Sequence, residues 1–100
     1  MSLVLAGTFR LAPERLEAFR PHILAMLTAT RAEDGCVEYA FAQDVADPGL
    51  LRVFETWRDQ AALDAHFQSP HMKAWREAGA AFGLSDRRIF AYEVAGQRQL

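Results

Sequence analysis

The sequence lacks the features that define several large classes of protein. It has one cysteine, Cys36, which excludes an internal disulfide framework and a cysteine-rich zinc site. Its six glycines are scattered, so no glycine-rich phosphate-binding loop is present. No apolar run approaches the ~20 residues that cross a bilayer. Because residues 1–9 hold no basic residue and only a short apolar run, we expect no signal peptide and a cytoplasmic location.

A strong charge of either sign is also missing. The 11 Lys and Arg against 13 Asp and Glu give a formal net charge of −2, so no basic excess attracts nucleic acid or an anionic membrane. The chain is rich in apolar residues instead. Of its 100 residues, 51% are hydrophobic and 11% are aromatic, which excludes a disordered chain. We predict one domain over 1–100, with a polar tail at 96–100 that frays.

Hydrophobic spacing and turn residues predict four strands and three helices. Apolar residues three and four apart, from Leu16 to Leu27, indicate a helix that starts at Pro13 and ends near Ala32, with a kink or break at Pro21. The elements, in order, are a strand at 3–11, that helix, a hairpin of strands 36–44 and 50–57 around Asp47-Pro48-Gly49, a short helix capped by Asp59, a helix from Ser69-Pro70 to Gly83, and a strand at 87–95.

This βαββαβ order predicts a ferredoxin-like α+β fold, in which an antiparallel sheet carries its helices on one face. Within the strand at 36–44, alternation places Val37, Tyr39 and Phe41 on one face. The strands at 3–9 and 36–54 are apolar on both faces, so the face without helices would be an exposed apolar surface. A second copy of the chain is its natural cover, and we predict a homodimer with two sheets packed face to face.

Two histidines lie near the expected contact between helices and sheet. His66 stands between Leu63 and Phe67 on the side that packs on the sheet. It is either a partly buried residue with one structural hydrogen bond or a base at the rim of an apolar pocket, because its ordinary pKa lies near neutrality. His71 is in the first turn of the last helix, as a surface residue or a second pocket residue.

Metal binding is not predicted. His66 and His71 are five residues apart with a Ser-Pro break between them, and together with His22 they form no metal-ligand spacing on one helix face. Cys36 is interpreted as a small buried residue rather than as the nucleophile of a Cys-His pair.

The strand at 50–57 contains an unusual carboxylate. Glu55 shares a face with Val53 and Trp57, where a carboxylate must pair or face water. It makes a structural ion pair or hydrogen bond with another strand, or it holds a donor in a functional site. Trp57 and Tyr39 have polar tips on large apolar rings, so both can line a pocket and donate one hydrogen bond.

Three stretches carry a family pattern: Glu33-Asp34-Gly35-Cys36-Val37-Glu38-Tyr39, Phe54-Glu55-Thr56-Trp57-Arg58-Asp59, and Ala62-Leu63-Asp64-Ala65-His66-Phe67-Gln68-Ser69-Pro70-His71. The pattern is a glycine and a cysteine before a tyrosine, a glutamate two residues before a tryptophan, and a histidine followed by Ser-Pro-His. It resembles the antibiotic biosynthesis monooxygenase family over about residues 3–94. The resemblance implies a dimeric α+β barrel, with a pocket between sheet and helices in each subunit.

The resemblance also implies an activity. The implied activity is that of a cofactor-independent monooxygenase, which oxidises a small quinol- or anthrone-like aromatic with dioxygen, without metal, flavin or haem. The catalytic pair would be His66, as base or proton shuttle, and Glu55, which would fix a neighbouring donor. The aromatic substrate would be bound by Trp57, Tyr39, Phe41, His71 and Phe67.

Other activities in the family leave two alternatives open. They are an isomerase or processing enzyme of a small oxygenated metabolite and a non-catalytic dimer that binds a small ligand. Haem degradation is not expected, because this sequence has Trp75-Arg76 and Gly7-Thr8 near the places where haem-degrading members carry an axial histidine and an asparagine.

Overall fold

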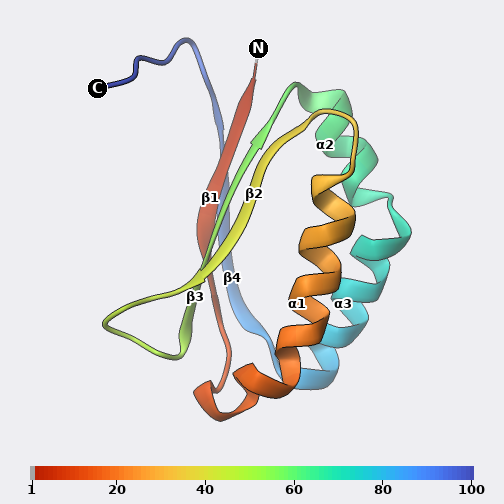
Figure 1. The fold of residues 1–100 in the computed structure, drawn as a ribbon, viewed down its shortest axis with the longest axis vertical. Helices are drawn as coiled ribbons and strands as arrows, with labels where there is room; N and C mark the ends of the chain where they lie inside the picture. The colour runs from red at the N-terminus through yellow and green to blue at the C-terminus, as the bar shows by residue number, and fades with distance from the viewer. Residues whose placement is uncertain (1) are drawn as a thin grey trace.

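A four-stranded sheet forms one layer of the protein and the helices form the other (Figure 1). The structure is a computed structural model that describes residues 2–100. Its elements are β1 (Leu3–Arg10), the 3-10 turn η1 (Pro13–Arg15), α1 (Leu16–Arg31), β2 (Cys36–Gln43), β3 (Leu50–Trp57), α2 (Gln60–Phe67), α3 (Pro70–Phe82) and β4 (Ser85–Glu93). The strand order is β2-β3-β1-β4 with all neighbours antiparallel, which confirms the ferredoxin-like α+β prediction.

Side-chain caps start the two helices that carry His66 and His71. Asp59 accepts a hydrogen bond of 2.8 Å from the Ala62 N–H at the start of α2. At the start of α3, Ser69 Oγ accepts one of 3.2 Å from the Met72 N–H, and proline fills the first helical position. Gly83 ends α3 at a φ of 78°, which glycine adopts without strain. These boundaries lie where the sequence predicted them.

The first helix differs from the prediction. A 3-10 turn at Pro13–Arg15 comes before it, and α1 itself begins at Leu16. Pro21 lies inside α1 and does not break it. A proline at this position removes the one N–H that would bond to the carbonyl of Glu17, a loss that packing on the sheet can offset. The last strand is also shifted, since it begins at Ser85 and ends at Glu93 rather than spanning 87–95.

The alternation predicted for β2 is interrupted by a bulge. Relative to β3, β2 has one extra residue between Cys36 and Glu38. Cys36 therefore lies on the same face as Tyr39, and Val37 is left 68% exposed. This corrects the prediction that Val37 shares the inner face with Tyr39 and Phe41.

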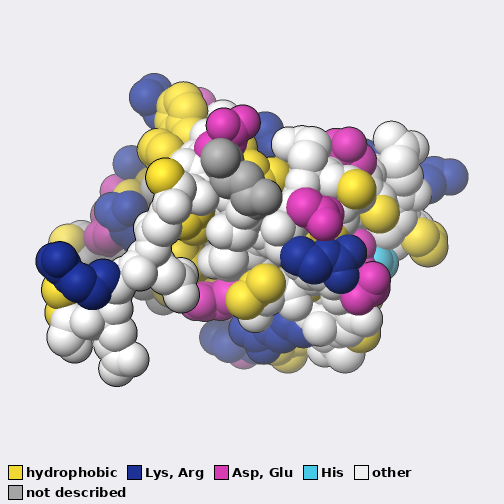
Figure 2. All heavy atoms as spheres, turned by 90° about the horizontal axis from the view of Figure 1, so that it is seen from above, with side chains coloured by type: hydrophobic (Ala, Val, Ile, Leu, Met, Phe, Trp, Pro, Cys, Tyr) yellow, Lys and Arg dark blue, Asp and Glu magenta, His cyan; other side chains and the backbone are white. Residues whose placement is uncertain are grey.

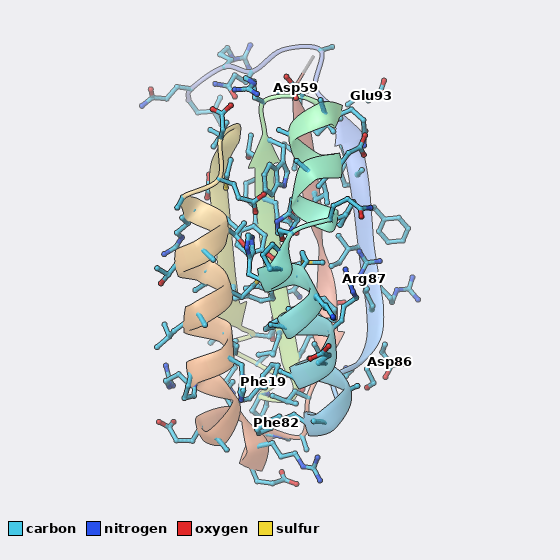
Figure 3. All side chains as sticks on the ribbon, turned by 90° about the vertical axis from the view of Figure 1, so that its right-hand side faces the viewer. Phe19, Asp59, Phe82, Asp86, Arg87 and Glu93 are labelled. Carbon is cyan, nitrogen blue, oxygen red and sulfur yellow. The ribbon has the colours of Figure 1, made fainter. Side chains whose placement is uncertain are left out.

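The core lies between the helices and the inner face of the sheet. Phe19 of α1 and Trp57 of β3 are both fully buried there. Figure 3 shows Phe19 and Phe82 near the same end of the helical layer, and their ring centroids lie 5.1 Å apart. Among residues 2–100, no helix combines the length and the apolar character needed to cross a membrane.

The other face of the sheet carries no helix (Figure 1). The strand register places Val4 and Ala6 of β1 on this face, beside Phe54 of β3 and Phe90 and Tyr92 of β4. The three aromatic residues are 40%, 54% and 55% exposed. Figure 2 looks down on one end of the molecule and shows hydrophobic side chains at the surface on the sheet side, at left. The outer sheet face of this chain is therefore an exposed apolar surface.

Gly7 of β1 marks a point where the sheet has no room for a side chain. A Cβ there would overlap backbone atoms of Arg88 and Ile89 on β4. We expect Gly7→Ala to lower the free energy of unfolding by about 1–3 kcal/mol, the usual cost of overpacking, as measured by urea unfolding. Gly96→Ala is the control, because it has open space around it and should change stability by less than about 0.5 kcal/mol. Equal stability of the two variants would contradict this account.

Candidate functional site

A cavity of about 460 Å³ opens between the inner face of the sheet and helices α2 and α3. Much of its wall is apolar, from Phe9, Phe41, Val53, Phe67, Met72 and Ile89. Three buried side chains bring polar atoms to the same wall: Tyr39, Glu55 and His66. A mostly apolar cleft of roughly 300–1,000 Å³ with a few convergent polar groups is typical of a small-molecule site.

Five of the seven predicted site residues line this cavity: Tyr39, Phe41, Glu55, His66 and Phe67. Trp57 and His71 do not, which differs from the prediction. Trp57 is fully buried in the sheet, and His71 lies on a separate recess of about 70 Å³. Both residues still lie next to the cavity. Trp57 packs against the ring of His66, and His71 binds the same Glu33 carboxylate as His66.

One carboxylate oxygen joins the two histidines. Glu33 Oε2 lies 2.6 Å from His66 Nδ1 and 2.8 Å from His71 Nε2. The side chain of His66 is only 2% exposed, whereas that of His71 is 21% exposed. Because an ionised carboxylate can only accept hydrogen bonds, each imidazole donates an N–H to Glu33. The cluster of Glu33, His66 and His71 thus leads from the buried site to the surface.

Two short turns bring these residues together. After α1, the Cys36 N–H donates to the Glu33 carbonyl and the Arg58 N–H donates to the Gly35 carbonyl, so the turn is tied to the end of β3. Gly35 adopts a φ of 86° in this turn. Between α2 and α3, Ser69 Oγ caps α3 and also donates a hydrogen bond of 2.7 Å to the His66 carbonyl. The last turn of α2 and the first turn of α3 consequently face the same carboxylate.

The hydrogen bond to Glu33 orients His66 as a base. With its proton on Nδ1, the ring keeps a lone pair on Nε2. Every buried polar side-chain atom of residues 2–100 has a partner, and Nε2 is not among the bonded atoms, so it opens on the cavity that His66 lines. Burial lowers the pKa of His66 below its ordinary 6.5, although the hydrogen bond from the ring to Glu33 opposes that shift. Near neutral pH the ring is therefore uncharged and able to accept a proton.

Glu55 and Trp57 form a second buried pair. Trp57 Nε1–H donates to Glu55 Oε1 at 2.8 Å, between residues on the same face of β3. Burial raises the pKa of Glu55 above its ordinary 4.5, while the bond from Trp57 and the charge of Arg87 lower it. Burial, with a contribution from Glu55, also raises the pKa of Tyr39 far above its ordinary value. The cavity thus combines a neutral base with two groups that hold their protons more tightly than usual.

The cluster also has the composition of a metal site. The ligand atoms of Glu33, His66 and His71 all lie within 4.8 Å of one another, brought together from separate segments rather than from one helix face. Carboxylate and imidazole suit zinc or iron. In this geometry, however, the same atoms are joined directly by short hydrogen bonds to one shared oxygen. A bound metal would need that oxygen and both ring nitrogens to move apart.

Glu33 is the residue of this cluster that the sequence interpretation did not single out. It lies in the quoted family pattern, directly after the predicted end of the first helix near Ala32. One signal pointed to it: a carboxylate at a helix C-terminus is unfavourable, because it faces the negative end of the helix dipole. Such a residue needs a partner elsewhere in the fold, and here the partners are His66 and His71.

Residues 2–78 match the sequence profile of the antibiotic biosynthesis monooxygenase family. The chain belongs to this family. A solved structure of the same family name from Deinococcus radiodurans superimposes with a TM-score of 0.89 at 26% identity, over 100% of this chain and 98% of that one. The family and fold inferred from the residue pattern are both confirmed.

Two curated relatives are similar over part of their length. A Synechocystis protein, sll1783, is 31% identical over 98% of this chain and 67% of its own. The Escherichia coli protein YgiN, named as a probable quinol monooxygenase, is 41% identical over 46% of this chain and 52% of its own. The chain thus spans about half to two thirds of the length of these two relatives.

Replacement of Glu33 tests the shared hydrogen bonds. In Glu33→Gln, the amide oxygen can take the place of Oε2 and accept from both rings, but both hydrogen bonds lose the carboxylate charge that strengthens them. We expect the free energy of unfolding at pH 7 to fall by about 1–3 kcal/mol in urea unfolding. The control is Asp34→Asn in the same turn, whose side chain is 92% exposed and whose ion pair contributes at most about 1 kcal/mol. Equal effects of the two substitutions would contradict the assigned role of Glu33.

Proposed function

We propose that this protein is a monooxygenase that oxidises a small quinol- or anthrone-like aromatic with dioxygen. The observation that carries the proposal is the free Nε2 of a neutral, buried His66 on the wall of an aromatic cavity. The names of the relatives support the same class of reaction. The electrons come from the substrate itself, so the proposed reaction uses no metal or organic cofactor.

The chemistry follows from removal of one proton. His66 Nε2 takes a proton from a phenolic O–H or an activated C–H, and the cavity holds the resulting electron-rich anion away from water. The anion passes one electron to dioxygen, the two radicals combine into a peroxide anion, and the proton taken up by His66 converts that anion into a hydroperoxide. Loss of water then leaves a new carbonyl. For an anthrone the balance is CH₂ + O₂ → C=O + H₂O, so one oxygen atom enters the product and the other leaves in water.

Glu33 and His71 have a supporting role in this proposal. When His66 Nε2 gains a proton, the ring becomes cationic, and the adjacent Glu33 carboxylate stabilises that charge. The Nε2 proton then passes to the peroxide formed from the substrate, which restores the neutral ring with its proton on Nδ1, while His71 holds the Glu33 carboxylate through the second hydrogen bond. The buried base thereby returns to its neutral form without opening the cavity to water.

Oxygen uptake tests the base. Protein-dependent oxygen uptake with a panel of anthrones and hydroquinones, above the autoxidation blank, is expected for wild type. It should fall by about 10²-fold or more in His66→Gln, the usual effect of losing a general base. His22→Gln is the matched control, because His22 is an exposed histidine on α1 and does not line the main cavity. Full activity in His66→Gln would overturn the assignment.

The same assay tests the expected pH dependence of turnover. The base works only in its neutral form, and burial places the pKa of His66 below 6.5. Turnover should therefore be constant above about pH 6.5 and fall as the pH drops through the lowered pKa. Loss of activity on raising the pH through 7 would contradict a neutral histidine base.

A specific observation favours isomerisation as the second candidate. Tyr39 and Glu55 retain their protons more tightly than usual and share the cavity with His66. A base and an acid on one cavity can move a proton between two positions of a substrate without dioxygen. Conversion at equal rates under nitrogen and under air would support the isomerase and overturn the monooxygenase.

We also propose that two copies pair through the outer face of the sheet. Its exposed Phe54, Phe90 and Tyr92 form an apolar surface of the kind that marks an interface. A sheet face with three large aromatics supplies the central apolar contacts that stable dimers need.

Sedimentation velocity tests this pairing. Wild type is expected to sediment as a dimer at micromolar concentration, and Phe90→Glu as a monomer, because it places a carboxylate in the apolar contact. Leu24→Glu is the control, since Leu24 is 53% exposed but lies on α1. A monomeric wild type, or equal disruption by both substitutions, would contradict the proposed interface.

A further inference from the structure

Most arginines of this chain bind an acceptor of the chain itself. Four of them pair with carboxylates and two bind backbone carbonyls: Arg10 with Asp47, Arg20 with Glu17, Arg52 with Asp44, Arg58 with Asp34 and Asp59, Arg15 with the Phe82 carbonyl, and Arg31 with the Tyr39 carbonyl. The ordinary state of a guanidinium group in this protein is therefore to bind an acceptor of the same chain.

Among the described residues, four arginines depart from that state, namely Arg76, Arg87, Arg88 and Arg98, and of these four Arg76 and Arg87 are the two that line the cavity. Arg76 comes from α3 and Arg87 from β4, and both line the 460 Å³ cavity. Within residues 2–100, neither makes an ion pair or a side-chain hydrogen bond. Figure 3 labels Arg87 on β4, which lies beside α3 in that view. Two unpaired guanidinium groups thus approach one cavity from different elements.

The charges of both arginines reach the buried polar groups. Burial is the main cause of the raised pKa values of Glu55 and Tyr39, and the charge of Arg87 lowers both. Burial is likewise the main cause of the lowered pKa of His66, and the charge of Arg76 lowers it further. At Tyr39 and His66 the neighbouring carboxylates of Glu55 and Glu33 have a larger effect than either arginine, so the positive charge of the cavity lies at the exposed edge that holds Arg76 and Arg87.

The carboxylates around the cavity leave these two charges unpaired. Asp86 lies on the rim, but its carboxylate accepts a hydrogen bond from Ser85 Oγ at 3.2 Å and forms no ion pair with either arginine among the described residues. Glu55 is committed to Trp57 through one oxygen. A guanidinium carries five N–H donors in a planar fork that fits a carboxylate through two parallel hydrogen bonds.

We propose that the cavity binds an aromatic compound that carries a carboxylate, with the ring among the aromatic side chains and the carboxylate held by Arg76 and Arg87. The proposal rests on the proposed function in taking this cavity as the substrate site, and it deepens that function by naming the substrate class: an aromatic acid. The acid group stays at the charged edge, which places the ring on the side of His66. Arg76 and Arg87 thereby act as specificity-determining residues.

Binding of two matched probes tests this assignment. The probes are 2-naphthoate and its neutral analogue 2-naphthamide, measured by isothermal titration calorimetry. Neither is a quinol or an anthrone, so binding is separated from turnover. Wild type is expected to bind the acid at least about tenfold more tightly than the amide, as charge-assisted hydrogen bonds predict. Raising the salt concentration should weaken only the binding of the acid.

The variants locate the effect. Arg76→Gln/Arg87→Gln should lower affinity for the acid about tenfold or more and leave affinity for the amide within about twofold. Lys73→Gln/Arg88→Gln is the control, because it removes the same charge from the same two elements at exposed residues that do not line the cavity. The control should bind both probes as wild type does.

Three results would overturn the aromatic-acid assignment: no binding of the acid, equal binding of acid and amide by wild type, or an equal loss of acid affinity in both double variants. The acid subsite and the monooxygenase activity are tested separately. Selective binding of the acid by a protein without oxygen uptake would keep the acid subsite and overturn the monooxygenase. Oxygen uptake by a protein without selectivity for the acid would keep the monooxygenase and overturn the acid subsite.

Discussion

The arrangement of the site depends on one oxygen atom. Glu33 Oε2 accepts from His66 and His71 at 2.6 and 2.8 Å, and these three residues come from the turn after α1, the last turn of α2 and the first turn of α3. The contact therefore ties all three helices together at one point above the sheet. It also determines which nitrogen of His66 carries the proton.

Two opposing effects set the charge of His66. Burial disfavours the imidazolium, and the hydrogen bond to Glu33 favours it, yet the pKa is lowered, so burial has the larger effect. Trp57 and Tyr39 contribute to that burial, with ring centroids 4.8 and 5.6 Å from that of His66. The two predicted ring-binding residues thus act on the base. Trp57 does so entirely from behind the cavity, and through its bond to Glu55 it also fixes the second polar group of the wall.

Most of the fold was predictable from the sequence, because helix ends and turns depend on the conformational preferences of their own residues. The contacts between elements were not predictable in this way. Ser69 and Gly83 mark helix ends through their own conformational preferences, and no partner is needed to recognise them. The bulge at Val37 depends on how β2 pairs with β3, and the alternation of residues within one strand carries no information about that pairing. Glu33 was missed for a similar reason, because its partners lie 33 and 38 residues away in two other helices.

The polar groups of the cavity separate the chemistry from the choice of substrate. His66 and Glu55 are held by hydrogen bonds to groups behind the wall, so replacing either would disturb buried partners as well as the cavity. Arg76 and Arg87 have no partner among the described residues and are exposed, so they can change without a cost to the core. A protein built in this way can keep its base and tautomer while its rim is adapted to a different ligand. If the proposed base and acid subsite are both correct, substrate choice depends on Arg76 and Arg87 at the rim rather than on His66.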